Sequence, residues 1–82
     1  MTVVRLYGRP GCHLCDEARA ELEEMAASGG GFEIEEIDID SDDALLRRYL
    51  ERIPVIEIGG EVVSELVLDG NAVRARLATL SR

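Results

Sequence analysis

Cysteine is scarce in this sequence, and its scarcity excludes a disulfide-stabilised scaffold. The 82 residues include two cysteines, Cys12 and Cys15, which lie three positions apart. Small domains that depend on disulfides usually carry about four to eight cysteines along the chain. A bridge across so short a loop also removes little conformational entropy from the unfolded chain. We therefore expect the pair to have a local chemical role.

Long apolar runs are also absent. No stretch approaches the roughly 20 apolar residues that a membrane-spanning helix needs. The N-terminal MTVVRLYG is interrupted by Arg5 and has neither the apolar segment nor the cleavage site of a secretory signal. We therefore expect a cytoplasmic protein without a membrane partner. Thiols are kept reduced in the cytoplasm, so closely spaced cysteines there are usually catalytic, redox-sensing or metal-binding.

Lysine is missing, and the charge balance is strongly acidic. All nine basic residues are arginines, they are scattered along the chain, and the formal net charge is −8. Such a surface repels the phosphates of nucleic acids and anionic lipids. We therefore expect no nucleic-acid partner, and we expect a monomer. Because His13 is the only histidine, no cluster of histidine and cysteine ligands is available for a metal.

The apolar content of 46% suffices for one small core, so we expect one domain over residues 1–82. The predicted order of elements is β-α-β-α-β-β-α, an α/β fold with a four-stranded mixed sheet and helices on both faces. The expected strands are Thr2–Tyr7, Phe32–Asp40 and one on each side of Gly59–Gly60. Three helices are expected. The first follows Cys12, the second starts at a cap on Asp40 or Ser41 and stops before Ile53–Pro54, and the third runs from Gly70 to Leu80 with Asp69 as its N-cap.

Apolar periodicity also predicts which positions are buried. In the second strand the pattern changes phase between Ile34 and Ile37, which indicates either a β-bulge or burial of both faces. For the three helices, the residues expected on the buried faces are Cys15, Ala18, Leu22 and Met25, then Leu45, Leu46, Tyr49 and Leu50, then Val73, Leu77 and Leu80.

The spacing of the cysteines predicts a reversible pair. With Cys12 at the start of a helix and Cys15 one turn later, their Cα atoms lie about 5 to 6 Å apart, which a disulfide can bridge. Cys15 shares the apolar stripe of the helix and should be covered. Cys12 precedes the first turn, where free N–H groups and the helix dipole favour an anion. We therefore expect Cys12 to be the attacking thiolate and Cys15 the resolving thiol.

Nearby charges should adjust the Cys12 thiolate in opposite directions. The helix dipole and Arg9 should lower the pKa of Cys12, whereas Asp16 and Glu17 should raise it. His13 is expected to be an exposed side chain that tunes the site weakly. Tyr7, at the end of the first strand, is expected to belong to the core.

The motifs RPGCHLC after a strand and RIPVI some forty residues later, with a hairpin and a helix at the end, resemble a glutaredoxin-like member of the thioredoxin-fold superfamily. The resemblance covers essentially the whole chain. It implies a cis peptide bond at Ile53–Pro54 that faces the cysteines, with the backbone groups of Ile53 pairing with a substrate chain. Proline is the residue that tolerates a cis bond at modest cost.

The sequence departs from glutaredoxins that use glutathione. They typically have Pro-Tyr between the cysteines, a basic residue after the second cysteine, and a Gly-Gly turn before the last helix. Only Arg9 and Asp69 correspond to their glutathione contacts. We therefore expect weak activity with glutathione, which remains a candidate co-substrate, and no bound cofactor. The differing positions are His13-Leu14, Asp16-Glu17 and Ser64–Asn71.

The function that the sequence favours is thiol–disulfide exchange, in which Cys12 attacks the disulfide of a protein or of a glutathione adduct and Cys15 resolves the mixed disulfide. A thiol reductant would then regenerate the pair. Two alternatives remain at this point. One is a carrier of an iron–sulfur cluster or a soft metal, because cysteine sulfur suits such metals. The other is a catalytically silent redox fold that serves as an interaction domain.

Overall fold

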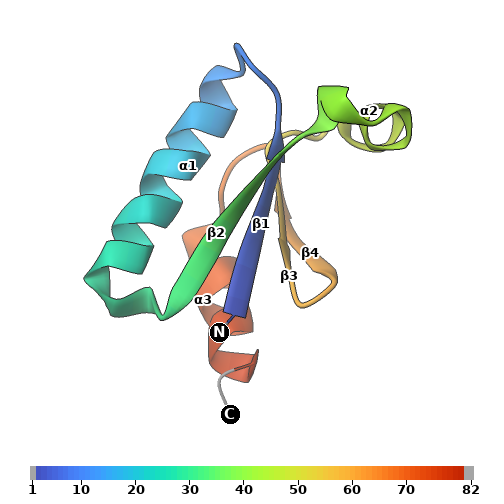
Figure 1. Ribbon diagram of the computed structural model, residues 1–82. Helices are drawn as coiled ribbons and strands as arrows, with labels where there is room; N and C mark the ends of the chain where they lie inside the picture. Colours follow the sequence, from blue (N-terminus) through green and yellow to red (C-terminus); the bar gives the residue numbers. More distant parts are fainter. Residues whose placement is uncertain (1, 81–82) are drawn as a thin grey trace.

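The structure is a computed structural model, and it describes residues 2–80 of the chain. Four strands form one mixed sheet in the order β2-β1-β3-β4 (Figure 1). Strand β1 is parallel to β2 and antiparallel to β3, and β3 is antiparallel to β4. This confirms the predicted mixed sheet. The strands are β1 (Thr2–Gly8), β2 (Phe32–Asp38), β3 (Val55–Ile58) and β4 (Glu61–Glu65).

Helices cover both faces of this sheet, as predicted. On one face, α1 (His13–Met25) and α3 (Gly70–Leu80) pack against the larger core; on the other, α2 (Asp43–Tyr49) packs against a smaller one (Figure 1). Successive residues of a strand point to opposite faces, so the two cores alternate along β1 and β3. The larger core contains Val4, Leu6, Ala18, Leu22, Phe32, Ile56, Ile58 and Val73, and the smaller contains Tyr7, Ile39, Tyr49 and Val55.

Strand β2 buries residues on both of its faces. It pairs with β1 in continuous register, so it has no bulge at the phase change. Ile34 packs against the larger core and Ile37 against the smaller one, which settles the choice left open by the sequence. The irregularity in the sheet lies instead in the pairing of β3 with β4, between Ile56 and Glu57.

The segment after β2 differs from the prediction. The strand ends at Asp38, because the Asp38 carboxylate accepts a hydrogen bond from the N–H of Asp40 (2.8 Å) and starts a short 3₁₀ turn, Ile39–Ser41. The cap of α2 is neither Asp40 nor Ser41. It is Asp42, whose carboxylate accepts from the N–H groups of Ala44 (2.8 Å) and Leu45 (3.3 Å).

The C-terminal part of the chain follows the prediction more closely. Gly59 and Gly60 form the hairpin turn. Their φ angles, 61° and 82°, are ones that residues with a side chain rarely adopt. Asp69 caps α3 by accepting from the N–H of Ala72 (3.1 Å). Two leucines assigned to buried helix faces are exposed: Leu50 is the C-cap of α2, and Leu80 is the last residue of α3. Both lie at helix ends.

Strands β2 and β4 are the edges of the sheet, and the sequence of β2 is strongly acidic. Within residues 2–80, no helix is long and apolar enough to cross a membrane. The acidic residues of β2 are Glu33, Glu35, Glu36 and Asp38.

We predict that Asp42→Ala lowers the free energy of unfolding by about 1 kcal/mol, because it leaves the first N–H groups of α2 without their acceptor. Asp42→Asn is the matched control, since it removes the same charge but keeps an oxygen that can cap the helix. Urea denaturation of both variants checks this. Equal losses for the two would show that charge, and not capping, is what Asp42 contributes.

Candidate active site

A tight turn places the first cysteine at the carboxyl end of β1. The N–H of Cys12 donates to the carbonyl of Arg9 (3.3 Å), which closes a four-residue turn. Pro10 suits the second position of such a turn, and Gly11, with a φ of 81°, suits the third. The sequence Arg9-Pro10-Gly11-Cys12 therefore has the pattern of a type II turn, and it delivers the chain directly into α1.

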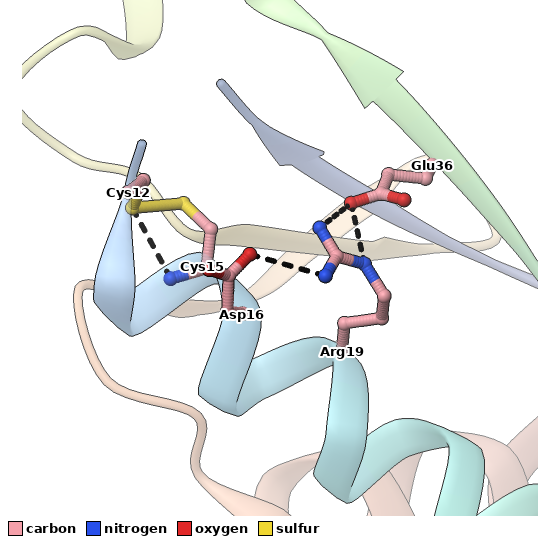
Figure 2. Close-up of a disulfide and its surroundings, with 5 residues drawn as sticks. All are labelled: Cys12, Cys15, Asp16, Arg19 and Glu36. Carbon is pink, nitrogen blue, oxygen red and sulfur yellow. Dashed lines mark hydrogen bonds and ion pairs between the residues drawn. A yellow bond between two sulfur atoms is a disulfide. The ribbon is translucent and has the colours of Figure 1, made fainter. Parts of the chain in front are cut away.

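Cys12 is the N-cap of α1. Its Sγ atom accepts a hydrogen bond from the N–H of Cys15 (3.1 Å), and its carbonyl accepts the first helical bond, from the N–H of Asp16 (3.1 Å). The two cysteines form a disulfide, and their Cα atoms are 5.2 Å apart, within the distance predicted from the sequence (Figure 2). The sulfur of Cys12 thus lies where an N-terminal helix turn offers a hydrogen bond to an anion.

The two sulfurs differ in access to solvent, as the sequence predicted. Cys15 is 1% exposed and lies on the face of α1 that also buries Ala18 and Leu22. Cys12 is only partly buried. A reagent or substrate can therefore reach Cys12 directly, whereas Cys15 is covered.

Gly8 is a residue of the site that sequence reasoning missed. A Cβ atom at this position would lie 2.9 Å from the Sγ atom and 3.1 Å from the Cβ atom of Cys15. Only glycine therefore allows β1 to approach the first turn of α1 so closely. In the sequence Gly8 serves equally well as a strand boundary, so the pattern gives no sign of this contact.

The charged residues predicted at the site have partners. Arg9 pairs with Asp40 (Nη2 to Oδ1, 3.4 Å), and His13 pairs with Glu17 (Nε2 to Oε2, 3.1 Å). His13 is highly exposed, as expected. Both pairs lie at the surface, where such contacts contribute little to stability.

Asp16 pairs with an arginine that sequence reasoning did not single out. The Oδ1 atom of Asp16 lies 3.1 Å from Nη1 of Arg19, and Arg19 also binds Glu36 of β2 through Nε (2.8 Å) and Nη2 (Figure 2). These three side chains line a groove of about 340 Å³ beside the Arg9–Cys12 turn, together with Gly8, Arg9, Pro10, Ile37 and Asp38.

The Ile53–Pro54 peptide bond is cis, and Pro54 is fully buried. Tyr7 is opposite Val55 in the pairing of β1 with β3, so one further step in this register brings Pro54 opposite Gly8. The proline therefore lies at the same end of the sheet as the cysteines.

The backbone of Ile53 is less available than the sequence resemblance implied. Its N–H donates to the carbonyl of Tyr49 (3.0 Å), so only its carbonyl is left to pair with a substrate chain. The carbonyl of Pro54 accepts from the N–H of Leu66 (3.1 Å), which draws the segment after β4 next to the proline. Leu66 and Val67, in that segment, are 51% and 67% exposed.

Tyr7 belongs to the smaller core, as predicted. Its ring packs against that of Tyr49, with centroids 4.9 Å apart, and its hydroxyl donates to Glu57 (3.4 Å). Burial is the main cause of a raised pKa for Tyr7. The side chain is therefore a packing residue in this structure.

Among residues 2–80, no three side chains of histidine, cysteine, aspartate or glutamate converge in a way that could hold a metal ion. Within one chain, the two cysteine sulfurs could supply only part of a tetrahedral metal site. A larger groove, of about 720 Å³, lies between the far end of α1 and α3 and is lined by neither cysteine.

Comparisons with known proteins bear on the family and the fold. A family model described as "Glutaredoxin-like domain (DUF836)" matches residues 3–78. No protein of curated function matches the sequence. The solution NMR structure of protein Ne2328 from Nitrosomonas europaea is 34% identical, with a TM-score of 0.82, over 92% of this chain and 89% of that one.

Two further solved structures are similar. The X-ray structure of protein XcR50 from X. campestris is 36% identical, with a TM-score of 0.67, over 93% of this chain and 96% of that one. A malarial protein is 15% identical, with a TM-score of 0.64, over 98% of this chain and 96% of that one. This last likeness bears on the fold alone.

We predict that Gly8→Ala lowers the free energy of unfolding of the oxidised protein by about 1 to 3 kcal/mol, because the added methyl group overlaps the sulfur of Cys15. In a Cys15→Ala background, which lacks that sulfur, the same substitution should cost less. Denaturation of the four proteins measures both costs. If the two costs are equal, the contact with sulfur is not the reason for glycine at position 8.

Proposed function

Because this chain belongs to the glutaredoxin-like domain family and has a thioredoxin-like fold, we propose that it is a thiol–disulfide oxidoreductase. One observation carries the proposal more than any other. The sulfur of Cys12 is the accessible N-cap of α1 and accepts the N–H of Cys15, while the sulfur of Cys15 is buried one turn away. A site with these properties suits one attacking and one resolving thiol.

The proposed exchange has two steps. In the reduced protein the Cys12 thiolate attacks one sulfur of a substrate disulfide, which forms a mixed disulfide and releases the other substrate sulfur as a thiolate. Cys15 then gives up its proton to a departing sulfur and attacks Cys12. This closes the Cys12–Cys15 disulfide and releases the second substrate thiol. The substrate gains two electrons from the cysteine pair and two protons, one from Cys15 and one from the solvent, which took up the proton of Cys12 when its thiolate formed.

Regeneration requires the reverse reaction with a thiol reductant. Its two thiols reduce the Cys12–Cys15 disulfide through a second mixed disulfide and become a disulfide themselves. Cys12 is the sulfur that the reductant can reach, since Cys15 is buried. We place this cycle in the cytoplasm, in a monomer that binds no cofactor, nucleic acid or membrane.

We propose a protein disulfide as the better substrate and glutathione as a poor one. Arg9, the candidate contact for a glutathione carboxylate, already pairs with Asp40. Next to the Ile53–Pro54 bond, where a glutathione site would offer a Gly-Gly turn, the chain exposes the apolar side chains of Leu66 and Val67. An apolar surface at the end of the sheet that also carries the cysteines favours a protein partner, which can cover it.

We predict that reduced protein treated with iodoacetamide near pH 7 is alkylated at Cys12 much faster than at Cys15. The physical reason is the helix N-terminus and solvent access at Cys12 and the burial of Cys15. Peptide mass spectrometry gives the two rates, and denatured protein, in which the rates should converge, is the control. Faster labelling of Cys15 would reverse the assigned roles.

We predict turnover with a protein disulfide and a clearly lower rate with a glutathione mixed disulfide, each measured with a chemical dithiol as the regenerating reductant. In a single turnover of pre-reduced protein without the dithiol, which would itself resolve the mixed disulfide, Cys15→Ser should release no fully reduced substrate and should retain it covalently on Cys12, because resolution needs a second thiol. Cys12→Ser is the matched control and should trap nothing. No turnover and no trapped adduct with either substrate would refute the proposed function.

A further inference from the structure

Asp16 occupies a position that is unfavourable for the proposed chemistry. Its N–H donates to the carbonyl of Cys12, so it lies one helical turn beyond the N-cap, and it directly follows Cys15 in the chain. A carboxylate so near the start of α1 opposes the formation of a thiolate at Cys12. Proximity alone would therefore make this residue a disadvantage to the site.

The structure shows this carboxylate drawn toward an arginine. Arg19 lies one turn further along α1 and contacts Asp16 through Nη1 (3.1 Å), and the Asp16 carboxylate lies between the disulfide and this arginine (Figure 2). Arg19 in turn is held by Glu36, which accepts from its Nε (2.8 Å) and Nη2 atoms. The hydrogen bonds that Arg19 donates to Glu36 are the main cause of a raised pKa for Arg19.

Other charged groups around the cysteines are already engaged. Each of these groups has a partner of its own, so none of them is left to compensate the charge of Asp16. These contacts are Arg9 with Asp40 (3.4 Å), His13 with Glu17 (3.1 Å), Arg52 with Glu65 (3.6 Å) on either side of the cis bond, and Asp69 with the N–H of Ala72 (3.1 Å).

We propose that Arg19, anchored by Glu36 on β2, is a positioning residue that holds the Asp16 carboxylate in an ion pair and so prevents it from turning toward Cys12, which keeps the Cys12 thiolate reactive. This inference rests on the proposed thiol–disulfide chemistry and adds the group that adjusts it. Because Glu36 belongs to a different element, the sheet itself fixes the arginine.

The inference requires Arg19 to act through Asp16, and a double-mutant cycle tests that requirement. The four proteins are the wild type, Arg19→Gln, Asp16→Asn and the double variant. The pH dependence of the rate at which Cys12 is alkylated, read from peptide masses, gives the pKa of Cys12 in each. Equilibration with a glutathione redox buffer gives the potential of the disulfide.

We predict that Arg19→Gln raises the midpoint pH of Cys12 alkylation by about 0.2 to 0.7 of a unit, the range for partly exposed charge pairs. Since this destabilises the reduced form, the disulfide should become less oxidising. In the Asp16→Asn background the same substitution should shift the midpoint much less. Arg19→Lys, which keeps the charge, should restore most of the wild-type value.

Arg74→Gln on α3 is the matched control, because it removes one exposed arginine that lines the groove at the far end of α1. It should leave the midpoint unchanged. Equal shifts for Arg19→Gln with and without Asp16 would overturn the inference, as would no shift in a variant whose urea midpoint shows that it is folded. If Cys12 of the wild type is alkylated no faster than Cys15, the proposed function itself is refuted.

Discussion

The close approach of β1 to the first turn of α1 is the constraint on which the site depends. Since Gly8 has no side chain, Cys15 can pack directly against the end of the strand. That contact buries the second sulfur and fixes the rotation of α1 over the sheet. Cys12, one turn earlier, is then left at the rim as the N-cap, where its sulfur meets both the solvent and the helix N–H groups. The chemical difference between two identical side chains follows from one steric allowance.

The surroundings of the cysteines combine two kinds of restraint. Tertiary packing decides access, through the burial of Cys15 and Pro54. Ion pairs between neighbouring elements decide where charge lies, and each of them is weak because it is exposed to solvent. A site built in this way has a rigid geometry and an adjustable electrostatic environment. Substitutions of surface charges in such a fold can therefore change chemistry with little effect on stability.

The order of the elements could be predicted because each boundary carries a residue with a strong local preference, such as Pro54 or the Gly59–Gly60 pair. The exact cap of α2 could not, because Asp40, Ser41 and Asp42 are all able to cap a helix and only the turn started by Asp38 selects among them. The spacing of the cysteines and their difference in exposure could be predicted from helix geometry and from the apolar stripe that Cys15 shares.

Contacts between distant elements were beyond the reach of sequence patterns. The sequence places Arg19 and Glu36 seventeen residues apart, on a helix and a strand, and both look like ordinary surface charges. The contact of Gly8 with Cys15 depends on how closely two elements pack, and hydrophobic periodicity does not report that distance. The bond from the N–H of Ile53 to the carbonyl of Tyr49 is local, but the resemblance, which implied that the backbone of Ile53 pairs with a substrate chain, gives no sign of it.

The acidic edge of the sheet affects how molecules of this protein meet one another. An edge strand offers unpaired backbone groups to any other strand, and a row of carboxylates on it makes pairing between two copies repulsive. Strand β2 has four acidic residues, Glu33, Glu35, Glu36 and Asp38, in seven positions. At high concentration this edge should therefore resist pairing between copies, while Cys12, which is only partly buried, lies away from it at the start of α1. The edge protects against aggregation without shielding the reactive end of the fold.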